Sequence, residues 1–163
     1  MRQGQTWNLI FGHALSQTRG DALQLEHTAG PNSLAALFHV AGSFVYGLST
    51  FLASGEVVLP TLLGMRNKFF VERYWTFVER HNITLLAAVP TVMSSLLSVS
   101  FGDANLTRVR ALFTGGAPLP DEIATNFERR FGIQVRNILG MTECAGVIFI
   151  GSVALAVCAE RFD

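Results

Sequence analysis

The chain has 163 residues, of which half are hydrophobic and 15% are charged, and its 12 basic and 12 acidic residues balance. This length fits one domain with a core of ordinary size, and the zero net charge gives no sign of a nucleic-acid or anionic-membrane partner. Because charged residues usually make up about a quarter of a soluble domain, we expect some apolar surface to serve self-association, a partner or further chain.

The sequence contains few signals that indicate the cellular compartment of the protein. Two cysteines, Cys144 and Cys158, are too few for a disulfide framework and fit a reducing compartment. The N-terminal residues lack the charged-then-apolar layout of a signal peptide. The longest charge-free apolar run, 145–159, is shorter than the ~18 residues that indicate a spanning helix. We therefore expect a cytoplasmic protein without a transmembrane span.

The N-terminal third predicts helices separated by loop chemistry. Residues 7–16 are weakly amphipathic and predict a helix, whereas 26–32 contain Gly-Pro and predict a loop. Residues 35–38 predict an extended segment. A mostly buried helix should follow from near Val40 and stop before Gly55.

From residue 56 onward, apolar runs alternate with segments that have one apolar face. The predicted strands are 56–59, 83–89, 109–114 and 133–138, and the predicted helices are 68–81, 91–98 and 121–131. Strands separated by single helices pair in parallel with right-handed crossovers. The expected fold class is α/β, a partial doubly wound, mostly parallel sheet with flanking helices.

Glycines follow the last two predicted strands, at Gly115-Gly116 and at Gly140. Ligands of parallel sheets bind beyond the carboxyl ends of the strands, and glycines let backbone N–H groups face a ligand without interference from Cβ. Alone, Gly115 and Gly116 are explained equally well by a tight strand-to-helix turn. The second glycine turn favours one shared binding site.

Thr142 and Glu143 come directly after the second turn. A hydroxyl and a carboxylate there could hold a phosphate oxygen and Mg²⁺, which prefers oxygen ligands. A helix cap by Thr142 explains the same position equally well. No His/Cys cluster in the sequence has metal-ligand spacing.

His39 lies in an apolar segment beside small residues that leave space for a substrate. A hydrogen-bonded core histidine is the more common explanation for such a position. The apolar residues 44–52 are most simply interpreted as part of the hydrophobic core. The alternative is that they line a site for an acyl chain.

Taken together, four segments resemble the large domain of the adenylate-forming acyl-CoA synthetase family, the AMP-binding ligases. They are 37–42 (LFHVAG), 88–91 (AVPT), 114–119 (TGGAPL) and 140–143 (GMTE). The resemblance implies a two-step reaction on a small carboxylic acid, with ATP, Mg²⁺ and CoA as cofactors or co-substrates. The carboxylate attacks the α-phosphate of ATP, and the CoA thiol then displaces AMP from the acyl-adenylate.

The resemblance also implies residue roles. His39 would lie near the acyl carboxylate, Thr142 would bind the α-phosphate and Glu143 the Mg²⁺, which makes these three the catalytic candidates. The implied nucleotide-binding residues are Gly115, Gly116, Ala117, Pro118, Asn137, Leu139, Gly140, Met141 and Thr142.

The chain departs from the family pattern in two ways. Leu139 stands where the family usually has an aromatic residue against adenine. The family's lysine-containing phosphate loop, ribose-binding aspartate, hinge and small C-terminal domain are not found in the sequence. We therefore expect an internal fragment from a truncated or frame-shifted gene: an irregular segment at 1–36, the ligase domain fragment at 37–147, and an apolar tail at 148–163.

Three functional hypotheses follow. The first is a fragment of an AMP-forming acid–CoA ligase for a fatty or aryl acid, inactive alone. The second is a non-catalytic AMP- or acyl-binding remnant or interaction module. The third is a truncated, non-functional product.

Overall fold

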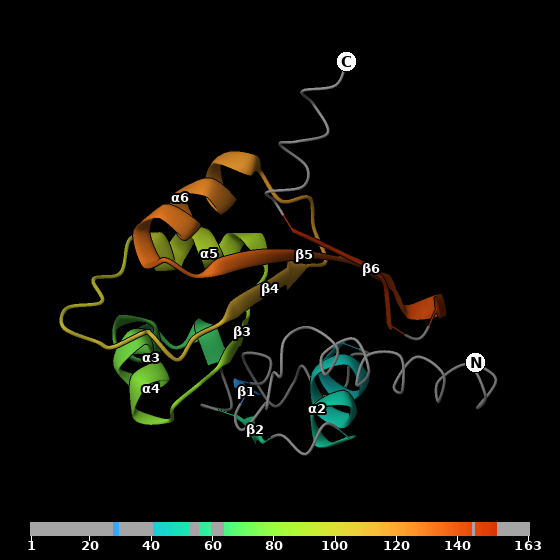
Figure 1. Ribbon diagram of the computed structural model, residues 1–163, viewed down its shortest axis with the longest axis horizontal. Helices are drawn as coiled ribbons and strands as arrows, with labels where there is room; N and C mark the ends of the chain where they lie inside the picture. The colour runs from blue at the N-terminus through green and yellow to red at the C-terminus, as the bar shows by residue number, and fades with distance from the viewer. Residues whose placement is uncertain (1–27, 30–40, 53–55, 60–63, 145, 153–163) are drawn as a thin grey trace.

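A computed structural model describes residues 28–29, 41–52, 56–59, 64–144 and 146–152 (Figure 1). The predicted helix over 7–16, the extended segment over 35–38 and His39 lie outside these residues. The strands are β1 (Thr28–Ala29), β2 (Val57–Val58), β3 (Leu85–Ala87), β4 (Ala111–Gly115), β5 (Gln134–Met141) and β6 (Gly146–Ser152). The helices are η2 (Ala41–Leu48), α2 (Ser49–Leu52), η3 (Gly64–Arg66), α3 (Lys68–Glu72), α4 (Tyr74–Arg80), α5 (Pro90–Leu97), α6 (Asp121–Phe131) and η4 (Thr142–Cys144).

The strands form one sheet in the order β2-β1-β3-β4-β5-β6. All neighbours pair in parallel except β6, which runs antiparallel to β5. The predicted α/β class, with a mostly parallel sheet and flanking helices, is confirmed. No helix in the described part of the chain is long and apolar enough to cross a bilayer.

Two strands were not predicted. The loop prediction for 26–32 is wrong at Thr28–Ala29, which form β1: Thr28 pairs with Val57 of β2 and also with Leu85 of β3. Pairing on both sides holds a two-residue strand that has no hydrophobic pattern of its own. β6 pairs along β5 from Arg136 to Met141, and the expected tail boundary after residue 147 falls inside this strand.

Pairing with β6 also lengthens β5. The predicted strand stops at Ile138, but β5 runs on to Met141, so Leu139 and Gly140 are strand residues rather than turn residues. A glycine weakens a strand on average, yet neighbouring backbone groups on β6 supply hydrogen-bond partners that a local pattern cannot show. The second turn therefore starts at Thr142.

Two predicted helices differ in detail. The helix expected over 68–81 is broken at Arg73, whose backbone (φ −108°, ψ 13°) leaves the helical region between α3 and α4. The helix expected from Val40 is π-helical from Ala41 to Leu48 before it becomes α2. It is less buried than expected, since Leu48 and Phe51 are exposed.

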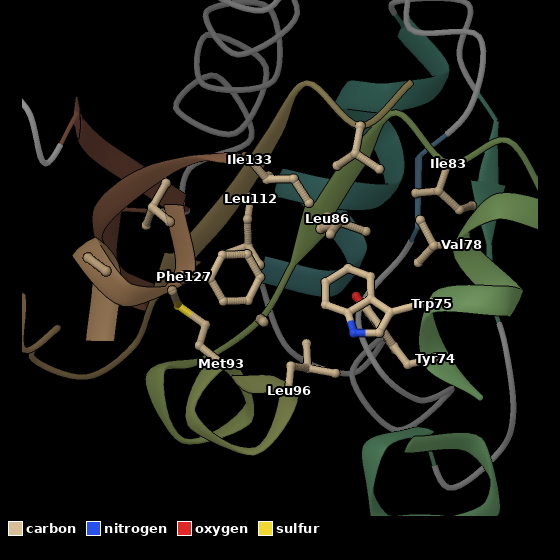
Figure 2. Packing of buried hydrophobic residues seen from close by; sticks show 14 residues of the cluster. Tyr74, Trp75, Val78, Ile83, Leu86, Met93, Leu96, Leu112, Phe127 and Ile133 are labelled. Atoms are coloured by element: carbon tan, nitrogen blue, oxygen red, sulfur yellow. The ribbon is translucent and has the colours of Figure 1, made fainter. Parts of the chain in front are cut away.

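The main core lies between one face of the sheet and helices α4, α5 and α6 (Figure 2). Leu86, Leu112 and Val135 contribute to it from β3, β4 and β5, and Trp75 and Phe127 fill it from α4 and α6. Burying large apolar side chains of this kind is worth roughly 1.5–3 kcal/mol each. The opposite face has a smaller cluster of Leu85, Ala111 and Phe113.

Helix α6 fixes the start of β5. Gly132 adopts a left-handed conformation (φ 67°) that ends the helix, as glycine commonly does there. Glu128 then accepts a hydrogen bond from the backbone N–H of Val135 at 2.8 Å. This contact ties the last turn of α6 to β5 and so helps to set where β5 lies beside β4.

Candidate functional site

The candidate site lies where the parallel strands end. β3, β4 and β5 are neighbours and run in the same direction, so their carboxyl ends meet at one edge of the sheet. Ala117 and Pro118 follow β4 there, and Thr142 and Glu143 follow β5. The structure thus brings both predicted glycine-containing segments to the same edge.

The register makes β5 longer than β4 at this edge. The last paired residues are Gly115 of β4 and Ile138 of β5, and β5 continues for Leu139, Gly140 and Met141. These three residues have β6 on one side, while β4 has already turned away on the other. We call this segment the β5 overhang. It places the GMTE segment beside the turn that follows β4.

Each glycine of the first turn has a structural reason of its own. A Cβ atom added to Gly115 would lie 2.5 Å from the carbonyl oxygen of Ile138, so no side chain fits there. Gly116 has φ +79°, which favours glycine, and no atom of the described residues lies within 4 Å of the place where its Cβ would be. The turn explanation thus accounts for both glycines, and the space beside Gly116 can accept another group.

Thr114, the residue before the glycines, is a feature that the sequence did not single out. Its side chain is 0% exposed, and its Oγ1 atom has no hydrogen-bond partner among the residues that the structure describes. Its Cα partner on β5 is Asn137, an exposed member of the predicted site. The TGGAPL segment marks this position, but burial of the hydroxyl depends on strand pairing and helix packing that the segment does not reveal.

The β5 overhang is unusually apolar for an exposed segment. Leu139 is 60% exposed and Met141 is 49% exposed. Thr142 and Glu143 are also exposed and begin η4. The apolar rim can contact a flat, partly apolar group, the hydroxyl of Thr142 can donate a hydrogen bond to an anionic group beside it, and the carboxylate of Glu143 can hold a cation.

A magnesium ion at this edge would depend on Glu143. Within the described residues, no group of three His, Cys, Asp or Glu side chains could hold a metal ion by itself. Mg²⁺ is commonly bound through one or two carboxylates together with substrate phosphates and water. An exposed single carboxylate fits that mode and does not fit a cage made by the protein alone.

One cavity in the described part lies elsewhere. It measures about 240 Å³ and is located between η3, α3 and α5. It is lined by Met65, Lys68, Val71, Glu72, Val92 and Ser95. None of these residues belongs to the predicted site.

Solved structures share this arrangement of strands and helices. Over 96% of the chain, the structure matches o-succinylbenzoate CoA synthetase from Bacillus subtilis with a TM-score of 0.71 and 24% identity, covering 29% of that chain. Over 92% of the chain, it matches the N-terminal domain of FACL13 from Mycobacterium tuberculosis with a TM-score of 0.72 and 19% identity, covering 35% of that chain. The fold is therefore that of the adenylate-forming enzymes.

Comparison of the sequence with known proteins identifies the family. The chain belongs to the AMP-binding enzyme family, whose model matches residues 11–161, a span that includes β6. It is 34% identical over 134 residues to sulfoacetate–CoA ligase from Cupriavidus necator, covering 80% of this chain and 25% of the relative. It is 32% identical over 130 residues to marinolic acid–CoA ligase from a Pseudoalteromonas species, covering 74% of this chain and 20% of the relative. The chain thus spans a fifth to a quarter of these relatives.

Proposed function

We propose that the chain is part of an AMP-forming acid–CoA ligase and contributes the nucleotide-binding edge of its large domain. The observation that carries this proposal is the β5 overhang, which sets the GMTE segment beside the glycine turn of β4 in a member of the AMP-binding family. The identity to two curated CoA ligases supports thioester formation with CoA as the second step.

In this proposal different residues contact different parts of the acyl-adenylate. Gly116 leaves open space and Ala117 is exposed, so both can border the adenine and the acyl group, and Leu139 offers an exposed apolar surface to the ring. Asn137, Gly140 and Met141 complete the nucleotide-binding side, and Pro118 borders the acyl group. His39 lies near the acyl carboxylate. His39 has no described position, so its role rests on the resemblance alone.

The charged part of the reaction falls to Thr142 and Glu143. Thr142 would donate a hydrogen bond to the α-phosphate, and Glu143 would hold Mg²⁺. When bound, Mg²⁺ would neutralise the charge that develops on the phosphate. Donors already placed around developing charge are commonly worth ~10²–10³ in rate each. The substrate is a carboxylic acid, and we propose a fatty or aryl acid.

The 163-residue chain alone should not catalyse the reaction. It spans a fifth to a quarter of the matching ligases, so most of the groups that surround ATP and the acid in a complete ligase would have to come from further chain. We place the protein in the cytoplasm because its two cysteines fit a reducing compartment. The limits 37 and 147 for the ligase fragment remain our proposal.

Calorimetry and an exchange assay test these statements. AMP should bind the chain, and Thr142→Val should weaken binding, whereas Thr125→Val, an exposed change on α6, should not. ATP–pyrophosphate exchange with fatty and aryl acids should be at background. No heat of AMP binding would refute the nucleotide-binding edge, and robust exchange would refute the inactivity.

A non-catalytic AMP-binding remnant is the second candidate. It is favoured by the same overhang, because Leu139 and Met141 offer apolar contacts to a nucleotide, while no group of three metal-ligating side chains lies in the described part of the chain. The two candidates differ in the effect of Mg²⁺. Tighter ATP binding with Mg²⁺ that disappears in Glu143→Gln favours the ligase site, and binding that ignores Mg²⁺ favours the remnant.

A further inference from the structure

The buried hydroxyl of Thr114 is a polar group that the described fold does not use. Thr114 is 0% exposed, and its Oγ1 atom has no hydrogen-bond partner in the part of the chain that the structure describes. A buried polar group without a partner destabilises a protein, and nearly all such groups in native proteins have one. Valine has the same shape without the hydroxyl and would serve packing better. A role other than packing therefore has to be sought in the neighbours of Thr114.

The neighbour of Thr114 on β5 is Asn137, and the two side chains lie on the same face of the sheet. Their Cα atoms are paired in the parallel register of β4 and β5, which lie side by side in Figure 1. Side chains alternate between the two faces along a strand, and paired residues share a face. Leu112 and Val135, the pair two residues earlier, both lie in the main core. Thr114 and Asn137 are therefore on that face, in the last pair but one of the ladder.

The distance between the two strands suits a hydrogen bond between these side chains. Neighbouring strands lie about 4.8 Å apart, and the hydroxyl of a threonine and the carboxamide of an asparagine can meet across such a gap. The strands cannot move apart at this level without losing the next pair, in which Gly115 is pressed against the backbone of Ile138. Asn137 is exposed, so its carboxamide has room to turn toward Thr114.

An asparagine carboxamide can read the edge of adenine with two hydrogen bonds. Its oxygen accepts from the 6-amino group, one N–H donates to N7, and the second N–H remains for another partner. We propose that Thr114 is a positioning residue: its Oγ1 accepts this second N–H from Nδ2 of Asn137 and holds the carboxamide toward the adenine of the nucleotide. The inference rests on the proposed function, in which Asn137 belongs to the nucleotide-binding side. Because Thr114 is 0% exposed, it acts through Asn137 and does not touch the nucleotide.

Two substitutions at residue 114 separate positioning from packing. Thr114→Val keeps the shape and removes the hydroxyl, whereas Thr114→Ser keeps the hydroxyl and removes the methyl group. If Thr114 only packed, affinity for AMP would follow stability, and the serine variant would bind more weakly. Positioning reverses this order. Thr114→Val should bind AMP about fivefold to tenfold more weakly although it melts at a higher temperature, and Thr114→Ser should bind within about twofold of the unaltered chain. Calorimetry with AMP measures affinity, and thermal melts without nucleotide measure stability.

Asn137→Ala tests whether the hydroxyl acts through the carboxamide. In this background Thr114→Val should cause no further loss of AMP affinity, because the side chain that Thr114 positions has been removed. Purine riboside 5′-monophosphate lacks the 6-amino group, and the preference of the chain for AMP over this compound should shrink in Thr114→Val. Thr125→Val removes a hydroxyl from an exposed position of α6 and is the matched control, with unchanged affinity.

The outcomes distinguish this role from the proposed function. Equal AMP affinity in Thr114→Val and the unaltered chain would overturn the role of Thr114 and leave the nucleotide-binding edge in place. The same conclusion would follow if Thr114→Ser lost as much affinity as Thr114→Val, if the loss persisted in the Asn137→Ala background, or if the preference for AMP did not change. Failure of the unaltered chain to bind AMP would refute the nucleotide-binding edge itself, and the role of Thr114 with it.

Discussion

Gly115 of β4 is pressed against Ile138 of β5, so that a Cβ atom at residue 115 would lie 2.5 Å from the Ile138 carbonyl oxygen and 3.3 Å from its Cβ. This contact is the last pair of the β4–β5 ladder. It joins the two segments of the candidate site through backbone atoms, which cannot move aside as the end of a flexible side chain can.

The two glycines of the turn should therefore respond differently to alanine. Gly115→Ala forces β4 and β5 apart and should destabilise the protein more than Gly116→Ala. The latter meets open space and costs only the left-handed backbone, about 1–2 kcal/mol. Chemical denaturation of both variants measures the difference. An equal loss of stability in the two variants would mean that the β4–β5 contact is looser than the structure shows.

Thr114→Val should stabilise the fold. The substitution keeps the shape and removes a buried hydroxyl that has no partner in the described part of the chain, a group that costs about 1–3 kcal/mol when left unsatisfied. Thr114→Ser is the control, because it keeps the hydroxyl and loses the methyl group, and it should destabilise. Thermal melts compare the three proteins. A lower melting temperature for Thr114→Val would show that the hydroxyl has a partner.

Glu128→Ala should weaken the junction between α6 and β5. It leaves the partly buried N–H of Val135 without its 2.8 Å acceptor, and we expect a loss of about 1–3 kcal/mol. Glu128→Gln keeps an oxygen acceptor and should lose less. Glu122→Ala removes an exposed charge from the first turn of the same helix and is the matched control. The idea fails if Glu122→Ala costs as much as Glu128→Ala.

Tyr74 should make the fold sensitive to alkali. Burial raises the pKa of its phenol above the ordinary value, so the folded state keeps the proton while the unfolded state loses it near pH 10. The contribution of the protonated Tyr74 phenol to the free energy of unfolding is fully present below the pKa that the phenol has in the unfolded state. Above that pKa the free energy of unfolding should fall by about 1.4 kcal/mol per pH unit, until the folded-state pKa is reached.

Denaturant titrations at rising pH measure this slope. Tyr74→Phe removes the ionisable group and should flatten the dependence, whereas Tyr46→Phe leaves Tyr74 in place and should retain it. A slope that survives in Tyr74→Phe would assign the alkaline effect to another group.

Leu139→Phe should tighten AMP binding if the β5 overhang faces adenine. Leu139 is exposed, so a larger ring can be accommodated, and stacking of a base on an aromatic side chain is worth about 1–3 kcal/mol. Calorimetry with AMP measures the gain. Thr125→Phe, at an exposed position of α6, is the control. An unchanged affinity in Leu139→Phe would place adenine elsewhere.

The parts of the fold that the sequence predicted well have strong local signals. The predicted strand 109–114 and helix 121–131 match β4 and α6 closely, because a continuous apolar run and an amphipathic repeat are each properties of a single segment. Gly132 and the acidic first turn of α6 also mark its ends locally.

The parts that were missed depend on neighbours. β1 exists because β2 and β3 lie on both sides of two residues, and the β5 overhang exists because β6 pairs with it. The break at Arg73 has no glycine or proline to announce it. For the candidate site, the sequence indicated which segments meet, but the burial of Thr114 depends on distant packing.

The aromatic core has a consequence for synthesis on the ribosome. Trp75 of α4 packs on Phe131 at the end of α6 with ring centroids 4.3 Å apart, and on Phe127 at 6.2 Å. β3, α5 and β4 all lie between these partners in the chain. A nascent chain therefore leaves the indole of Trp75 without the aromatic cover that α6 supplies until that helix has emerged from the exit tunnel, and during that interval chaperones have access to it.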